Sequence, residues 1–129
     1  MRTIKTIFLS VVCLIFYGCP NTDDVDSIIY IKNNSQNDIY FWERGKDPEL
    51  LWKPNETFLI PSQSTHLLKG NYLEAHSDGS KFYIWLFDRE VIDNTPWEEV
   101  VENEMYLIRY ELTLDELNAM NWELVYDGN

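Results

Sequence analysis

The stretch KFYIWLFDRE, residues 81–90, carries the strongest structural pattern in the chain. Successive side chains of a β-strand point to opposite faces of the sheet. The two alternating sets are Phe82, Ile84 and Leu86 on one face and Tyr83, Trp85 and Phe87 on the other. Both sets are apolar, as in strands that are covered on both faces. We therefore expect a central strand here.

Shorter strand patterns lie on both sides of this stretch. Residues 27–43 contain two β-branched and aromatic runs joined by the turn-forming NNSQND, which predicts a hairpin. Further short strands are expected at residues 57–60, 64–70, the start of 71–81, 105–112 and 121–127. Gly45, Pro48 and Pro54 indicate a loop between the second and third strands.

Two short helices are expected in the C-terminal half. Thr95, Pro96 and Glu98 fit an N-cap, a first helical position and a capping box, so a helix is predicted over residues 96–103. Thr113 and Glu116 repeat the device for a helix of about two turns. The whole pattern predicts one mostly-β domain over residues 28–129, an antiparallel β-sandwich or small barrel with two short helices.

The N-terminal residues 1–18 have the anatomy of an export signal. Arg2 and Lys5 precede an uncharged apolar run at residues 7–17. This run is shorter than the roughly 20 residues of a membrane-spanning helix and fits the apolar region of a signal peptide. Gly18 provides the small residue before a cleavage point, which would leave Cys19 as the first mature residue.

The segment FYGC at residues 16–19 resembles the bacterial lipobox, although Phe16 stands where leucine is usual. The resemblance implies that the Cys19 sulfur carries a diacylglycerol group and anchors the protein to a membrane. An ordinary secretory signal or an uncleaved anchor are the alternatives. Residues 19–27 are then a lipidated cysteine with an acidic tether.

The tether itself resembles two features of Bacteroidota lipoproteins. Its acids Asp23, Asp24 and Asp26 are similar to a surface-export signal of that group. Ser27, between Asp26 and Ile28, fits a short O-glycosylation motif. Together they imply a lipid anchor in the outer membrane, on the cell surface of a Gram-negative bacterium.

A longer stretch, residues 94–122, carries a second resemblance. The Pro96-Trp97 helix start, the segment RYELTLDEL and the NW pair before the last strand resemble small uncharacterised lipoproteins of gut Bacteroidota. The strand YIWLFDREVI at residues 83–92 fits the same pattern. The resemblance implies a lipoprotein with a single mostly-β domain, but it implies no substrate.

The charge of the chain restricts its partners. There are 22 Asp and Glu residues against 10 Lys and Arg, for a formal net charge of −12. This excess argues against nucleic acid, because basic patches supply most of that affinity. It also argues against direct attraction to an anionic membrane surface. The acidic surface then serves solubility, or it attracts a basic partner or divalent cations.

No catalytic, metal or cofactor motif stands out. The chain has two histidines, His66 and His76, and no G-x-S-x-G or zinc-type histidine spacing. The acids of FDREVIDN and EEVVENE lack the order of a calcium loop, and we read them as solvated surface. We therefore expect a protein that is not an enzyme and holds no metal or cofactor.

Aromatic residues are the most suggestive feature for ligand binding. The chain contains 5 Trp, 8 Tyr and 6 Phe. Trp52 and Trp97 lie outside the expected core strands, and Trp42 is the next candidate, so these three are the candidate ligand-facing aromatics. The alternative is that they fill or cap the core, which a domain without a disulfide needs.

Three functions remain open from the sequence. The first is a lipid-anchored, non-catalytic interaction module of the cell envelope, whose partner is an envelope protein or another ligand. The second is a glycan-binding surface lipoprotein that serves polysaccharide uptake. The third is an acidic inhibitor or immunity-type protein that neutralises a basic enzyme.

Overall fold

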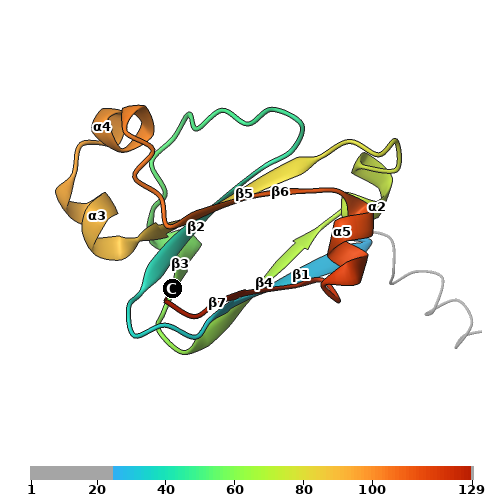
Figure 1. Cartoon of the computed structure of the whole chain (residues 1–129), viewed down its shortest axis with the longest axis horizontal. Coiled ribbons are helices and arrows are strands. Elements are labelled where there is room, and N and C mark those ends of the chain that lie inside the picture. Colours follow the sequence, from blue (N-terminus) through green and yellow to red (C-terminus); the bar gives the residue numbers. More distant parts are fainter. Residues whose placement is uncertain (1–24, 129) are drawn as a thin grey trace, which may run out of the picture.

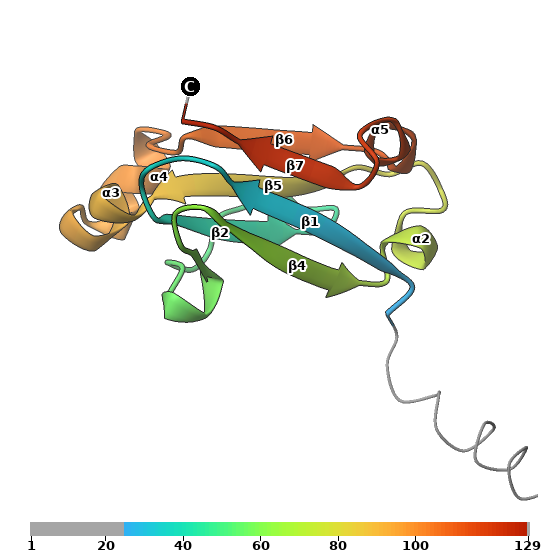
Figure 2. The ribbon, with the colours of Figure 1, turned by 90° about the horizontal axis from the view of Figure 1, so that it is seen from below.

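Two β-sheets face each other across one apolar core in the computed structural model, which describes residues 25–128 (Figures 1 and 2). The first sheet has the order β4-β1-β7, with β4 at Ser64–Gly70, β1 at Ser27–Asn33 and β7 at Glu123–Tyr126. The second has the order β3-β2-β5-β6, with β3 at Leu59–Ile60, β2 at Ile39–Arg44, β5 at Phe82–Asp88 and β6 at Ile108–Leu112. The predicted mostly-β sandwich is therefore confirmed, and the described sheets do not close into a barrel.

The strand β5 is central, as its two apolar faces predicted. It pairs with β2 on one side and β6 on the other, both antiparallel. Its inner residues Phe82, Ile84 and Leu86 are completely buried between the sheets. Burial of each such side chain contributes about 1.5–3 kcal/mol to stability. Its other apolar face lies under helices and a loop, and this outer layer builds the groove described below.

The predicted hairpin over residues 27–43 is wrong, although both of its strands exist. The strand β1 pairs antiparallel with β4 and parallel with β7, whereas β2 pairs with β3 and β5. The NNSQND connection instead carries the chain from one sheet to the other. Fully buried Asn33 fixes this arch, because its amide nitrogen donates to the Asn37 and Ile60 carbonyls at 2.8 and 3.0 Å.

Within residues 25–128 the short α-helices are α2 at Tyr72–Ala75, α3 at Arg89–Asn94, α4 at Trp97–Glu102 and α5 at Leu114–Ala119, and a 3₁₀ turn, η1, covers Glu56–Phe58. The capping box of α5 is confirmed, with Thr113 and Glu116 in both of its hydrogen bonds. The prediction that Thr95 caps α4 is wrong. Pro96 occupies that position, and Thr95 instead ends α3.

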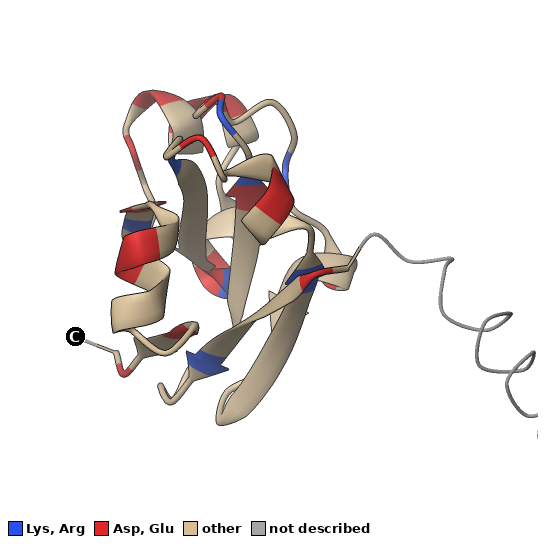
Figure 3. Ribbon diagram, turned by 90° about the vertical axis from the view of Figure 1, so that its right-hand side faces the viewer, with Lys and Arg blue, Asp and Glu red and all other residues tan. Residues whose placement is uncertain are grey.

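Two helices were not predicted. The helix α3 begins because the Asp88 carboxylate accepts a hydrogen bond from the Glu90 amide at 2.8 Å. The helix α2 replaces a predicted strand, because the Asp26 carboxylate, distant in sequence, accepts from the amides of Leu73 and Glu74. Figure 3 shows this end of the molecule, with acidic residues in red on α2 and α5.

Candidate binding groove

The outer face of the four-stranded sheet carries a second apolar cluster. Its buried members are Tyr40, Trp85, Phe87, Ile92 and Val100. The helices α3 and α4 cover one end of this face, where the Trp97 ring meets the Phe87 ring edge-on at 5.7 Å. The other part of the face is covered by the loop between β2 and η1, and a groove remains between that loop and the end of α4.

The groove has a volume of about 540 Å³. Three segments that are distant in sequence line it. They are the loop residues Pro48, Glu49, Leu50 and Leu51, the α4 end and the segment after it with Val101, Glu104 and Tyr106, and the sheet residues Trp85 and Arg109. Apolar walls with a few charged groups are the usual composition of small-ligand sites.

Arg109 lies in the floor of the groove. It sits opposite Trp85 in the β5–β6 register, and its guanidinium carbon lies 5.1 Å from the Tyr83 ring centroid and 5.9 Å from that of Trp85. A cation over an aromatic face is attracted by the ring quadrupole. Within residues 25–128 the Arg109 side chain forms no hydrogen bond or ion pair. Stacking therefore holds the guanidinium while its five N–H donors stay available.

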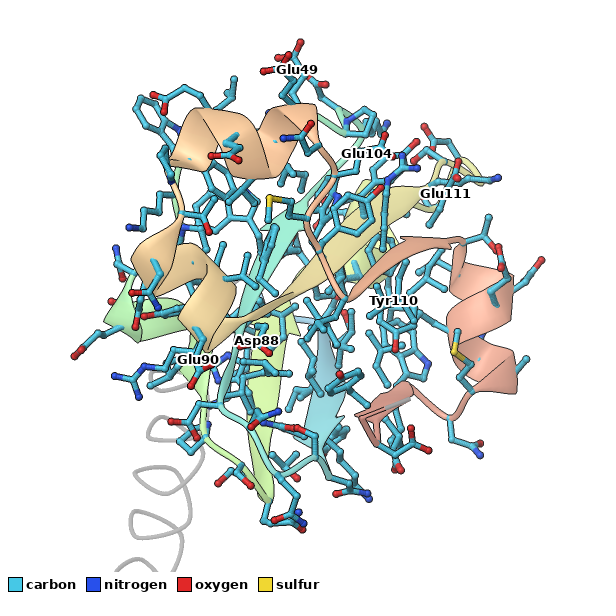
Figure 4. The ribbon with its side chains drawn as sticks, turned by 60° about the vertical axis from the view of Figure 1, so that its left-hand side comes forward. Glu49, Asp88, Glu90, Glu104, Tyr110 and Glu111 are labelled. Carbon is cyan, nitrogen blue, oxygen red and sulfur yellow. The ribbon has the colours of Figure 1, made fainter. Side chains whose placement is uncertain are left out.

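Glu49 and Glu104 provide carboxylates on the groove walls. Both residues are exposed, and neither carboxylate has an ion-pair partner in the described part of the chain. Figure 4 shows them on one side of the molecule, away from Asp88 and Glu90 at the other end. The groove thus presents one cation and two anions that have no ion-pair partner among residues 25–128.

Glu104 also has an unusual backbone. Its φ is +50°, in the left-handed region that glycine and asparagine adopt most readily at helix ends. This conformation costs a residue with a side chain about 1–2 kcal/mol. The helix α5 ends in the same way, where Asn121 has a φ of +55°, so the helix end sets this backbone, and the Glu104 carboxylate lines the groove from it.

The three candidate ligand-facing aromatics lie in different surroundings. Trp52 is 66% exposed and follows the groove residue Leu51 directly. Trp97 and Trp42 pack partly buried against the second apolar cluster, and the Trp42 ring meets Phe58 at 4.7 Å. None of the three tryptophans lines the groove. Trp52 is adjacent in sequence to the lining residue Leu51, and the other two are not adjacent to any lining residue.

The histidines do not form a catalytic arrangement. His76 is buried, with Nδ1 3.0 Å from the Ser80 hydroxyl and its ring against Tyr72 and Phe82. His66 lies over Phe41 at 4.5 Å, and burial lowers its pKa.

A buried carboxyl lies near His76. The Tyr72 hydroxyl donates to the Glu43 carboxylate at 2.8 Å. Burial raises the pKa of Glu43, and the Tyr72 hydrogen bond and His76 oppose that rise. Burial also raises the pKa of the Tyr72 phenol, and Glu43 adds to that effect. This pair closes one end of the core.

Two acids of FDREVIDN, Asp88 and Asp93, have structural partners. Asp88 caps α3, and Arg89 lies between Asp38 at 2.9 Å and Asp93 at 3.3 Å. Within the described residues no group of three or more His, Cys, Asp or Glu side chains is placed to hold a metal ion.

Ser27, the predicted O-glycosylation residue, opens β1. Its hydroxyl donates to Asp26 at 2.6 Å and accepts from the Tyr72 amide at 3.2 Å. Cys19, the predicted lipid attachment residue, lies outside the described residues, as do Asp23 and Asp24. Glycosylation and lipidation both stay predictions.

Glu49, Glu104 and Arg109 were not predicted as a site from the sequence. Arg109 carries one usable signal, since it is a lone cation on the strand that follows the aromatic strand 82–88. Its position over Tyr83 and Trp85 depends on the strand pairing, which the sequence does not reveal. Glu104 was one of several acids near α4, and only its backbone conformation distinguishes it.

No protein-family model, curated protein or solved structure matches this chain. None of the described helices is long and apolar enough to span a membrane. The groove is therefore interpreted from its own chemistry.

Proposed function

We propose that this protein is a lipid-anchored, non-catalytic protein of the outer membrane that binds a neutral glycan in the groove. The observation that carries the proposal is Arg109. Its guanidinium is held over Tyr83 and Trp85 by stacking, while its donors and the carboxylates of Glu49 and Glu104 have no partner within the described chain.

The groups in the groove match the chemistry of a sugar. A sugar hydroxyl both donates and accepts, so it pairs with carboxylate oxygens and with guanidinium N–H groups alike. Hydrogen bonds to charged groups contribute more than neutral ones, about 1.5–3 kcal/mol each. Leu50, Leu51 and Tyr106 add apolar surface for the C–H faces of the ring. Trp52, which is exposed on the same loop, would extend that surface if it turns toward a bound sugar.

The charge of the site favours a neutral glycan over an acidic one. Two carboxylates and one guanidinium leave the groove with an excess of negative charge, and the chain as a whole is acidic. A uronate or sulfate would be repelled by this field. The same field opposes nucleic acid, as the composition already indicated.

The sequence supports the location that we propose. The signal-like residues 1–18 and the lipobox-like segment ending at Cys19 fit a lipoprotein. Two or more acyl chains hold a protein stably on a bilayer. Surface exposure would place the groove in reach of polysaccharides outside the cell.

A carbohydrate screen of the purified protein tests the proposal. We expect neutral oligosaccharides to bind the wild type and the double variant Glu49→Gln/Glu104→Gln to lose at least tenfold in affinity. The matched control is Glu98→Gln/Glu99→Gln, which removes two exposed acids of α4 outside the groove. Capture of a basic protein in place of any sugar would favour the inhibitor reading and contradict the proposal.

A further inference from the structure

The outer face of the three-stranded sheet is uncovered. We call it the open face, and its outward positions are Ile28, Tyr30, Lys32, Thr65, Leu67, Lys69, Glu123 and Val125. The alternate residues of the same strands, such as Ile29, Ile31 and Leu124, point into the core. Figure 2 looks at the sheet β4-β1-β7, and none of the helices lies over it.

Exposed apolar groups gather on the open face and its edge. Tyr30 and Leu67 lie directly opposite each other and are 39% and 44% exposed, and Val125 is 46% exposed. Val25 and Leu73 continue this surface at the edge, around a hollow of about 640 Å³ that Trp122 also lines. Tyr and Trp are the residues that favour a membrane–water interface.

The charge of the open face differs from that of the rest of the molecule. The chain has a formal net charge of −12, yet the open face carries Lys32 and Lys69 against the single acid Glu123. Lys32 pairs with Glu123 at 3.0 Å, which leaves the positive charge of Lys69 in excess. Asp26 lines the adjoining hollow and offsets that charge, so the open face with its edge is close to neutral on a strongly acidic protein.

The chain connects this face to the predicted anchor by a short link. Cys19 and Val25 are six residues apart, and an extended chain spans at most about 3.6 Å per residue, so the link reaches no more than about 22 Å. Val25 lies at the edge of the open face, in the lining of the hollow. An anchor at Cys19 thus holds this edge close to the bilayer.

We propose that the open face rests on the headgroup layer of an anionic phospholipid bilayer. This inference depends on the proposed lipid anchor. Close to a negative surface the acidic faces are repelled, while a lysine near that surface contributes about 1 kcal/mol of attraction. The overall negative charge argues against binding of the free protein to an anionic membrane. Once the protein is tethered, the same charge turns the acidic faces away from the bilayer and leaves the open face toward it.

The orientation has a consequence for the groove. The open face and the groove lie on the outer faces of the two opposed sheets. Contact of the open face with lipid turns Arg109 and its neighbours away from the membrane. The ligand then reaches the groove from the medium.

Spin labels test this on the full lipidated protein in vesicles of phosphatidylethanolamine and phosphatidylglycerol. Leu67→Cys and Thr65→Cys place a label on the open face, and Glu98→Cys places a control label on α4. Under the proposed processing, Cys13 is removed with residues 1–18 and the Cys19 sulfur carries lipid. The introduced cysteine is then the one free thiol that reacts with the spin label. On vesicles we expect a several-fold fall in collisions of the Leu67 and Thr65 labels with an aqueous nickel complex, and no change at Glu98.

Three other outcomes overturn the inference in distinguishable ways. Labels at Leu67 and Thr65 that stay as accessible as Glu98, on protein that floats with vesicles, refute the orientation and leave the anchor intact. Protein that does not float refutes the anchor and the orientation with it. Shielding that is already present in lipid-free Cys19→Ala protein shows that a second copy covers the face.

Discussion

Arg109 of β6 lies across Trp85 of β5, with its guanidinium carbon 5.9 Å from the centroid of the indole ring. The two residues are direct partners in the strand register, and Tyr83 completes the contact at 5.1 Å. A stacked arginine keeps a fixed orientation without using its hydrogen-bond donors. This relationship makes the groove a preorganised polar site on an apolar floor.

Arg109→Met is expected to abolish glycan binding with little change in stability. The exposed cation–π contact contributes about 0.5–1 kcal/mol, and the methionine stem retains part of the packing. Isothermal titration and urea denaturation measure the two effects separately. Arg109→Lys is the matched variant, because it retains the charge and loses the planar fork of donors. Its glycan affinity is expected to lie between those of the wild type and Arg109→Met. Equal affinity in all three proteins would remove Arg109 from the site.

Glu104→Asn is expected to stabilise the protein by up to about 1 kcal/mol and to weaken ligand binding. Asparagine accepts the left-handed backbone more readily than glutamate, and it carries a shorter, neutral carboxamide in place of the carboxylate. Glu104→Gln separates the two effects, since it retains the backbone strain and removes only the charge. A loss of stability in Glu104→Asn would show that the conformation at φ +50° is not strained.

Asn33→Ala is expected to destabilise the domain by about 2–3 kcal/mol. The substitution leaves the Ile60 carbonyl and the Ser35 amide without the partners that Asn33 provides. Each buried polar group that loses its partner costs about 1–3 kcal/mol. Asn34→Ala is the control, because Asn34 is exposed. Similar unfolding midpoints for the two variants would show that the arch does not depend on Asn33.

The stability of the protein is expected to fall as the pH rises through the pKa of Glu43. Burial raises the pKa of this carboxyl above its usual value of 4.5, so between the two values the folded state binds more protons than the unfolded state. Glu43→Gln removes the buried charge and retains an acceptor for the Tyr72 hydroxyl. Denaturation at several pH values is expected to show the variant gaining stability relative to the wild type as the pH rises through that range, with a constant advantage above it. A difference that is the same at every pH would exclude Glu43 as the cause.

Trp52→Ala and Trp97→Ala are expected to differ in stability. If both were ligand-facing aromatics, both substitutions would abolish glycan binding and leave the fold unaffected. The structure places Trp97 against Phe87 and leaves Trp52 exposed. Thermal unfolding is expected to show a loss of roughly 2 kcal/mol or more for Trp97→Ala and less than about 0.5 kcal/mol for Trp52→Ala. Reduced glycan affinity is expected for Trp52→Ala alone.

The central strand could be predicted because its pattern is local. Residues 82–87 alternate between two apolar sets of side chains. This pattern alone indicates that both faces of the strand are covered, without knowledge of which strands pair with it. The capping box at Thr113 and Glu116 is local in the same way and formed as predicted. These features depend on residues within a few positions of each other.

The failures of prediction involve contacts that are distant in sequence. The arch at residues 33–38 looks like a hairpin turn, and only the bond from Asn33 to the Ile60 carbonyl distinguishes it. The helix α2 needs Asp26, almost fifty residues earlier, as its cap. The groove combines a loop, a helix end and two strands, so its residues could not be grouped without the sheet order.

The central claim is that a neutral glycan binds beside Arg109, and a titration followed by NMR tests it most directly. Neutral oligosaccharides selected by the carbohydrate screen are added to isotope-labelled protein. We predict shifts of the Arg109 Nε–H and of the Glu104, Leu51 and Tyr106 amides, with none in α3. Unchanged spectra, or shifts confined to other parts of the surface, would contradict the account.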